Sequence, residues 1–307
     1  MWCLAPYESK SKTMNTRALL LVTLLSLLGI SGQAQIIKDY SDAELEVYYN
    51  KHLEIDTTQM GAQAQDTKMS LRIGGGHSLF ASTKRMWADS LRTYNFALHE
   101  TLYYKLNPIG GNQPWRPLGS AEGEYLFKNM PEGKNTVYHN FGFDNYVYAE
   151  DIEPQEWILG DSVRSILGYE CRLAECDYRG RHWIAWYAPE IAVSEGPWKL
   201  GGLPGLILEA YDPSRHYVFT ALGMTTEVPG KVGIHIFSKS DLSEISREKY
   251  LHFRWKRMNE HQDPSEKLHA AGIIESKKKQ EESVETVYSH YDFEETDYPH
   301  VMNLQKK

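Results

Sequence analysis

The chain has 307 residues, of which 41% are hydrophobic and 24% are charged, and its formal net charge at pH 7 is −8. This length and composition are typical of a globular protein with one large domain or two small ones. Because the chain carries no overall excess of Lys and Arg, its composition argues against a general nucleic-acid-binding protein, which needs a clustered basic surface for phosphate contacts.

The N-terminal residues have the layout of an export signal. Ala18–Ile30 form an apolar run that follows a basic residue and precedes a small-residue cleavage site, which is the order found in secretory signal peptides. The run is shorter than the roughly 20 apolar residues that a membrane-spanning helix requires. We therefore expect residues 1–34, an upstream extension and a signal peptide, to be removed. Met14 is an alternative start to Met1.

The position of the first cysteine bears on localisation. Lipid anchoring requires a cysteine at the cleavage site, whereas Cys3 lies upstream of the apolar run. We therefore expect a protein that is not a lipoprotein, has no transmembrane span in its mature chain, and is periplasmic or associated with the outer envelope.

The mature chain is predicted to begin with a helix and a linker, residues 35–67. Ser41 followed by Glu44 resembles a capping box, which predicts a helix that continues to about His52. Gln59–Thr67 has few apolar anchors and is predicted to be a flexible connection.

Residues 68–240 are predicted to form a central antiparallel β domain. Met69–Ile73 and Ser78–Ala81 alternate apolar and polar residues around Gly74–Gly76, which predicts a hairpin because no Lys-Ser/Thr follows as in a phosphate-binding loop. Apolar spacing near 3.6 residues predicts one helix near 84–106. Turn residues at roughly ten-residue intervals then separate four predicted strands. These are Glu124–Asn129, Asn135–Asn140, Asn145–Ala149 and Glu156–Gly160.

The best-specified element is the hairpin formed by Tyr169–Tyr178 and Arg181–Tyr187. The two-residue turn Arg179-Gly180 sets every cross-strand pair. The predicted pairs are Tyr178–Arg181, Cys176–Trp183, Ala174–Ala185, Arg172–Tyr187, Leu173–Trp186, Glu175–Ile184 and Asp177–His182. The last pair resembles half of a catalytic or metal arrangement, but we interpret it as a solvent-side pair near the turn.

Two cysteines remain in the mature chain, Cys171 and Cys176. Five steps along an extended strand separate their Cα atoms by roughly 16 Å, whereas a disulfide needs less than about 7 Å. An odd offset also places them on opposite faces of the strand. We therefore predict two free thiols, with Cys171 the more buried.

The most distinctive run of the sequence is Gly196–Glu209, in which two clusters of turn residues lead into a short apolar strand. Leu203-Pro204-Gly205-Leu206 has Pro and Gly at the positions that favour a type II turn. Pro and Gly carry no nucleophile, base or metal ligand, so we interpret the motif as structural. Its residues are Gly196, Pro197, Gly201, Gly202, Leu203, Pro204, Gly205 and Leu206.

The stretch Gly202–Leu208 (GLPGLIL) resembles the motif that gives the GLPGLI family its name, and Tyr169–Asp212 is similar to the central block of that family. Weaker likeness extends to Met69–Ser82, Glu156–Leu159 and Asp241–Leu268. The chain departs from the family pattern at Ala192, where Pro is common, and at Cys176. The resemblance implies an exported Gram-negative envelope protein without an established activity, and it supplies no catalytic residues.

A second hairpin and a further strand are predicted after the motif. Leu206–Tyr211 and His216–Ala221 are expected to pair around residues 212–215, with Leu208 opposite Phe219 on an apolar face. Val232–Phe237 is predicted to be another strand.

Residues 241–307 are predicted to form a charged helical tail, with helices over Ser243–Asn259 and Pro264–Glu282. The first helix carries a basic surface with interleaved aromatics, which suits acidic partners or lipid headgroups, although we favour a solvated helix face. Its residues are Arg247, Lys249, Arg254, Lys256, Arg257, Phe253 and Trp255. We expect Ser283–Lys307 to be loosely held.

These elements predict a mainly β fold of the α+β class, with a curved antiparallel sheet, half-barrel or sandwich of roughly 8–10 strands. Three functions remain open: a non-catalytic exported envelope binding or accessory protein, a hydrolase, or a structural component of an envelope assembly. No H-E-x-x-H stretch and no G-x-S-x-G elbow occurs in the sequence. We favour the non-catalytic binding protein, without cofactor or metal, and leave open a protein, lipid or glycan partner.

Candidate binding residues lie in and near the loop that precedes the motif. They are Trp183, Trp186, Trp198, Glu190 and Glu195. The hydrolase alternative would use the carboxylates of Glu190, Glu195 and Glu209 in pairs.

Overall fold

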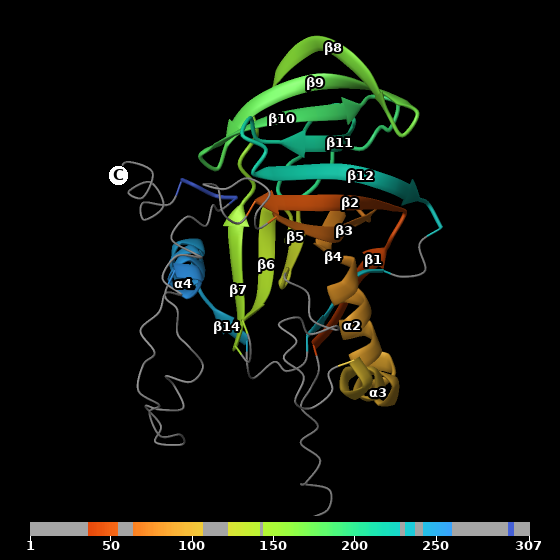
Figure 1. The fold of residues 1–307 in the computed structure, drawn as a ribbon, viewed down its shortest axis with the longest axis vertical. Coiled ribbons are helices and arrows are strands. Elements are labelled where there is room, and N and C mark those ends of the chain that lie inside the picture. The colour runs from red at the N-terminus through yellow and green to blue at the C-terminus, as the bar shows by residue number, and fades with distance from the viewer. Residues whose placement is uncertain are drawn as a thin grey trace, which may run out of the picture.

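A computed structural model of the protein describes residues 36–54, 64–106, 122–141, 144–227, 231–236, 242–259 and 294–297. Within these residues, twelve strands form one sheet in the order β14-β7-β6-β5-β4-β3-β2-β12-β11-β10-β9-β8 (Figure 1). Neighbouring strands are antiparallel except β14 and β7, which are parallel. The strands are β2 Leu45–Glu54, β3 Ala64–Gly74, β4 His77–Ser82, β5 Glu124–Lys128, β6 Lys134–Phe141, β7 Asp144–Asp151, β8 Ile158–Ile166, β9 Tyr169–Tyr178, β10 Arg181–Ala188, β11 Leu206–Tyr211, β12 Tyr217–Thr225 and β14 Leu242–Glu244.

A two-stranded sheet and three helices complete the described fold. β1 (Ile36–Asp42) pairs with β13 (Lys231–Ile236). The helices are α2 Thr83–Tyr94, α3 Phe96–Leu106 and α4 Arg247–Asn259. No helix within the described ranges combines the length and the apolar composition needed to span a membrane. The predicted signal peptide, the alternative start and the predicted helix at 264–282 lie outside the described residues.

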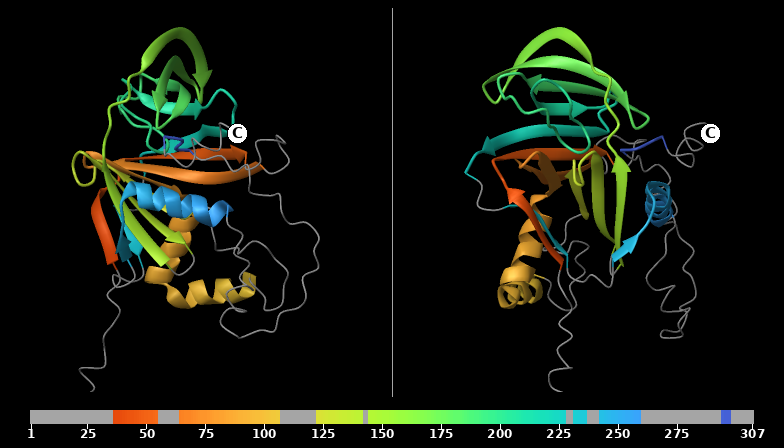
Figure 2. Two further views of the ribbon diagram at one scale, coloured as in Figure 1. Left: turned by 90° about the vertical axis from the view of Figure 1, so that its left-hand side faces the viewer. Right: turned by 180° about the vertical axis from the view of Figure 1, so that it is seen from behind.

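The large sheet is strongly curved, as the sequence predicts for this fold class. Strands β8 to β12 and β2 run across the molecule in Figure 1, whereas β5 to β7 run nearly along its long axis. α4 lies beside β7, and the right-hand view in Figure 2 shows it on the opposite side of the molecule from α2 and α3. The described strands outnumber the predicted ones because residues 36–42, 45–54 and 242–244 also form strands. Residues 64–67, predicted to belong to a flexible connection, are instead the start of β3.

The central strands of the sheet are buried on both faces. One hydrophobic cluster contains Phe80, Leu126 and Val137 from β4 to β6. A second cluster contains the neighbouring residues of these strands, together with Met86 of α2 and Val232 of β13. Burial of both faces removes apolar surface from water and so stabilises these central strands.

The hairpin of β9 and β10 has the predicted register. All predicted pairs from Tyr178–Arg181 to Arg172–Tyr187 are present. Arg179 and Gly180 have φ of +54° and +78°, as expected for a type I′ turn. Asp177 contacts Nδ1 of His182 at 2.8 Å in an exposed cross-strand pair, so the interpretation as a solvent-side pair is confirmed.

The predicted helix from Ser41 to about His52 is wrong, because these residues contribute to β1 and β2. β2 lies between β3 and β12 in the middle of the sheet and pairs with both along its length. Val47, Tyr49 and Leu53 are buried at alternate positions, which is the period of a strand and not of a helix. This alternation, with the β propensity of Val and Tyr, outweighs the capping pattern.

The predicted single helix at 84–106 is interrupted. Asn95 has φ of −146° and separates α2 from α3. Its N–H donates to the Leu91 carbonyl at 2.7 Å, and its Oδ1 accepts from the N–H of Leu98 at 3.1 Å. Asn95 therefore ends one helix and caps the next, a role that its short amide side chain suits.

The predicted register of the β11–β12 hairpin is also wrong, by two residues. Ala210, and not Leu208, lies opposite Phe219. Oδ1 of Asp212 accepts from the N–H of Tyr217 at 2.7 Å, so the connection takes residues 212–216. Because the shift is even, the face that each residue occupies is unchanged.

Both cysteines are free, as predicted, and both are buried. Cys171 is fully buried and Cys176 is 2% exposed, and burial raises the pKa of the Cys176 thiol to about 12. Because the thiolate is the reactive form, we expect a thiol reagent to label neither cysteine rapidly in the native protein at pH 7. Unfolding without reductant should expose both. Mass spectrometry showing a loss of two hydrogens and no labelling after unfolding would contradict this prediction.

Candidate functional site

The loop between β10 and β11, residues 189–205, fills the interior of the curved sheet. Trp198, Leu200 and Leu203 of this loop are buried in the larger hydrophobic cluster. Nζ of Lys128 on β5 donates to the carbonyls of Gly196 at 2.8 Å and Leu200 at 3.0 Å. The motif is thus held between strands that are distant in the sequence.

The turn before β11 is not the predicted type II turn. The N–H of Gly205 donates to the Leu203 carbonyl at 2.8 Å, which closes a three-residue turn centred on Pro204. Gly205 has φ of +152°, and a Cβ at this position would lie 2.4 Å from the Ala188 oxygen. Glycine is therefore required here by both backbone conformation and close approach.

The three candidate tryptophans do not share one surface. Trp183 is fully buried and Trp198 is 5% exposed, and their ring centroids are 5.6 Å apart within the core. Trp186 is half-buried on the other face of β10, where the guanidinium of Arg164 lies 4.2 Å from its ring centroid. Trp183 and Trp198 therefore serve as core residues.

Two of the three candidate carboxylates are each paired with a cation. Glu195 pairs with Lys128 at 2.5 Å, Glu209 pairs with Arg164 at 2.7 Å, and Glu190 is exposed. Among the described residues, no group of His, Cys, Asp and Glu side chains has the geometry of a metal site.

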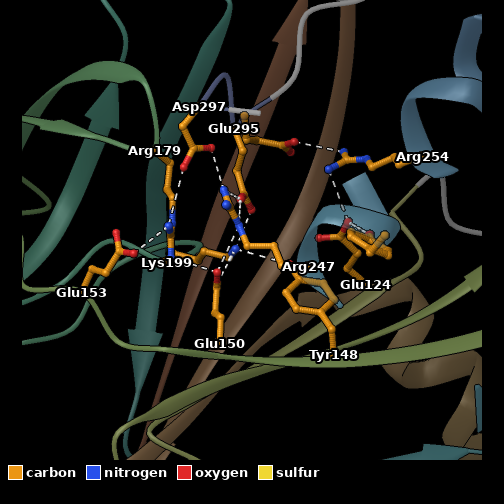
Figure 3. Close-up of polar contacts among 12 residues, drawn as sticks. Glu124, Tyr148, Glu150, Glu153, Arg179, Lys199, Arg247, Arg254, Glu295 and Asp297 are labelled. Carbon is orange, nitrogen blue, oxygen red and sulfur yellow. Dashed lines mark hydrogen bonds and ion pairs between the residues drawn. The ribbon is translucent and has the colours of Figure 1, made fainter. Parts of the chain in front are cut away.

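Within the described residues, the most densely charged site surrounds Glu294–Asp297, which we call the acidic segment. Five cationic side chains contact it, and we call them the cation cradle (Figure 3). They are Lys51 on β2, Arg179 in the β9–β10 turn, Lys199 in the central loop, and Arg247 and Arg254 on α4.

The first glutamate of the acidic segment binds one end of the cradle. Glu294 accepts from Nζ of Lys51 at 2.5 Å and from Nη2 of Arg254 at 3.0 Å. Lys51 also pairs with Glu122 at 2.7 Å, and Arg254 pairs with Glu124 at 3.4 Å. These charges are largely buried, so their mutual attraction is screened less than that of a surface pair.

The second glutamate binds the other end. Glu295 pairs with Lys199 at 2.5 Å and with Arg247, and Asp297 pairs with Arg247 at 2.6 Å. Lys199 and Arg247 also contact Glu150 of β7, at 2.5 Å and 3.2 Å. Figure 3 shows the side chains of Arg179, Lys199 and Arg247 converging between Glu150 and Glu295.

The backbone of the acidic segment lies against the β9–β10 turn. The N–H of Thr296 donates to the Arg179 carbonyl at 2.9 Å, and its hydroxyl donates to the Gly180 carbonyl at 2.7 Å. A Cβ on Gly180 would lie 2.5 Å from the Thr296 hydroxyl oxygen and 2.6 Å from the Asp297 nitrogen. The turn glycine thus makes room for the segment.

The cradle keeps its charges ionised. Burial alone lowers the pKa of Lys199, but the carboxylates of Glu295 and Glu150 outweigh burial and hold that pKa well above its usual value. For the acid Glu294, burial has the opposite effect and raises the pKa, but the charges of Arg254 and Lys51 outweigh burial and lower the pKa to about 2. Each charge is therefore maintained by its partner at neutral pH.

Acid is expected to weaken this site. A carboxylate whose pKa falls from about 4.3 in the unfolded chain to about 2 in the folded one stabilises the fold above the unfolded pKa. That stabilisation is lost as the pH falls through the folded pKa. Urea unfolding at several pH values should therefore show a smaller acid-induced loss of stability in Glu294→Gln than in the wild-type chain. Equal losses would contradict this prediction.

Two sequence predictions about the C-terminal region are corrected here. The tail expected to be loosely held contains Glu294–Thr296, which are buried. The basic face of α4, expected to be solvated, directs Arg247 and Arg254 onto the acidic segment. Their seven-residue spacing places them on one helix face, and this spacing was the signal available in the sequence. The structure does not describe the side chains of residues 255–257, which were also part of the predicted basic surface.

Comparisons with known proteins were informative over one short stretch. A family model described as a protein of unknown function (Porph_ging) matches residues 178–209, from the end of β9 to β11. No curated protein matches the chain. Two solved structures of PNGF-II, in the P21 and C2 space groups, are similar over 70% and 73% of this chain, with 15% and 14% identity and TM-scores of 0.44. The chain spans about a third of the length of those chains, 33% and 34%.

Proposed function

We propose that this chain is an exported, non-catalytic binding or accessory protein of the cell envelope and a member of the GLPGLI family. The family match over residues 178–209 supports the membership because it contains Gly202–Leu208. The signal-like N-terminus supports export.

One observation supports the binding function most directly. The densest group of charges in the described chain holds a polypeptide segment through side-chain and backbone contacts, instead of presenting an open reactive group. Catalysis by acid and base requires groups within reach of a substrate, whereas two of the three carboxylates of the hydrolase alternative, Glu195 and Glu209, are each paired with a cation. Recognition of a chain segment requires only the complementary contacts seen here.

The experiment is an affinity capture of the mature protein, tagged after residue 34, from an envelope extract. We expect one ligand species at a defined stoichiometry, and we expect its mass to be the same after prolonged incubation as before. Recovery of a shortened or hydrolysed ligand would contradict a non-catalytic role and favour the hydrolase. Co-purification of a large fixed assembly would favour a structural component.

A further inference from the structure

The acidic segment is held by contacts that any similar chain could supply. Its four residues, Glu-Glu-Thr-Asp, carry no apolar side chain, so burial of apolar surface does not fix it. Ion pairs to the cation cradle and two hydrogen bonds donated by Thr296 hold it in place. We infer that the cation cradle is a binding site for a short acidic segment of a partner protein, and that Glu294–Asp297 is the chain's own occupant of that site. This inference rests on the proposed binding function.

The cradle selects for negative charge because, without the acidic segment, its cations would outnumber the carboxylates that contact them. Among the described residues, the pairs that Lys199 and Arg247 make outside the acidic segment both go to Glu150. If the segment departed, Lys199 and Arg247 would both depend on the Glu150 carboxylate, which already pairs with Arg179 as well. Breaking a buried ion pair from one side is strongly destabilising. An empty cradle is therefore disfavoured. The acidic segment is replaced by another anionic chain more readily than by water.

The positions of the carboxylates define the sequence that fits. Glu294 and Glu295 are adjacent in the sequence and reach opposite ends of the cradle. Asp297, two residues after Glu295, shares Arg247 with it. The site therefore suits acidic residues at the first, second and fourth positions of a four-residue stretch.

The backbone contact favours a polypeptide over other polyanions. Thr296 donates its N–H to Arg179, and the absence of a side chain at Gly180 permits this approach. A sulfated or carboxylated glycan supplies anions but no backbone amide in this register. The site thus combines charge recognition with recognition of the peptide main chain.

The first test measures the binding of a fluorescent peptide of residues 292–299 to the mature chain by anisotropy. In the double variant Glu294→Gln, Glu295→Gln the own segment is weakened, so we expect this variant to bind the peptide at least about tenfold more tightly than the wild-type chain. A peptide with Gln at the three matching acidic positions should not bind. Equal affinity of both chains for the acidic peptide, or equal affinity of the two peptides, would overturn the inference.

If the double variant does not fold, Thr296→Pro replaces it. This substitution removes the N–H donor of the own segment and keeps every charge of the cradle and the segment. The same increase in affinity for the acidic peptide is expected, and its absence counts against the inference in the same way.

The second test separates peptide recognition from attraction to any anion. Gly180→Ala is added to the variant used in the first test. It places a Cβ against the bound peptide backbone and should weaken peptide binding at least about tenfold. Gly168→Ala is the matched control, because Gly168 also follows a positive-φ residue in a hairpin turn, has φ of +87°, and has nothing within 4 Å of the added Cβ. If both substitutions weaken binding equally, or neither does, the backbone contact is not part of the site.

Dextran sulfate provides the final comparison. Tight binding that Gly180→Ala leaves unchanged would assign the cradle to polyanions in general and overturn the peptide assignment. If the envelope capture yields an unaltered ligand but the acidic peptide does not bind, the proposed binding function is supported. The assignment of the cation cradle as its binding site is then wrong.

Discussion

Replacing Lys199 by methionine is expected to lower the free energy of unfolding by about 3–5 kcal/mol. Nζ of Lys199 lies 2.5 Å from Glu150 and 2.5 Å from Glu295, and both glutamates are at least 92% buried. Methionine keeps the length and the apolar stem of the side chain but removes its charge. The two buried carboxylates then keep Arg247 as a shared partner but lose the lysine charge between them. Their mutual repulsion favours protonation of one carboxylate or entry of water into the site.

Lys134→Met is the matched control. Lys134 pairs with Asp151 at 2.7 Å, a distance similar to those at Lys199, but the two side chains are 43% and 83% exposed. An exposed pair of this kind contributes at most about 1 kcal/mol. Urea unfolding of the two variants therefore separates burial from pairing. Equal and small effects would show that water reaches the cradle freely.

The parts of the fold that follow from neighbouring residues could be predicted from the sequence. The β9–β10 register is set by a two-residue turn whose second residue is glycine, so the pairing of every later residue follows. The β11–β12 register could not be predicted in the same way. There the Asp212 side chain accepts a backbone N–H and lengthens the loop, and composition alone does not reveal which of two loop lengths forms.

The cation cradle could not be predicted because its parts are far apart in the sequence. Lys51, Lys199 and Glu294 come from a central strand, a loop and the C-terminal region, and only the curvature of the sheet brings them together. A lysine in a strand is normally expected to face solvent. The alternation of β2 places Lys51 on the buried side, and its charge is accommodated because Glu122 and Glu294 neutralise it.

The structural role of the GLPGLI stretch is tested at Gly205. Gly205→Val is expected to lower the free energy of unfolding by about 3 kcal/mol, because it combines an unfavourable positive φ with a Cβ that lies 2.4 Å from the Ala188 oxygen. Relief of this contact requires the end of β10 to move away from β11. Such a movement would weaken the packing of Leu203 and Leu206, both of which are buried in the larger cluster.

Gly202→Val distinguishes the close approach from the backbone conformation. Gly202 has φ of +83° and nothing within 4 Å of an added Cβ, so this variant should show only the conformational cost, about 1–2 kcal/mol. Thermal and urea unfolding of both variants measure the difference. If the two variants are equally stable, the close approach of Gly205 to the end of β10 does not explain the need for glycine at this position. If instead Gly205→Val folds like the wild-type chain but no longer captures the envelope ligand, the motif is itself a binding surface and not a scaffold.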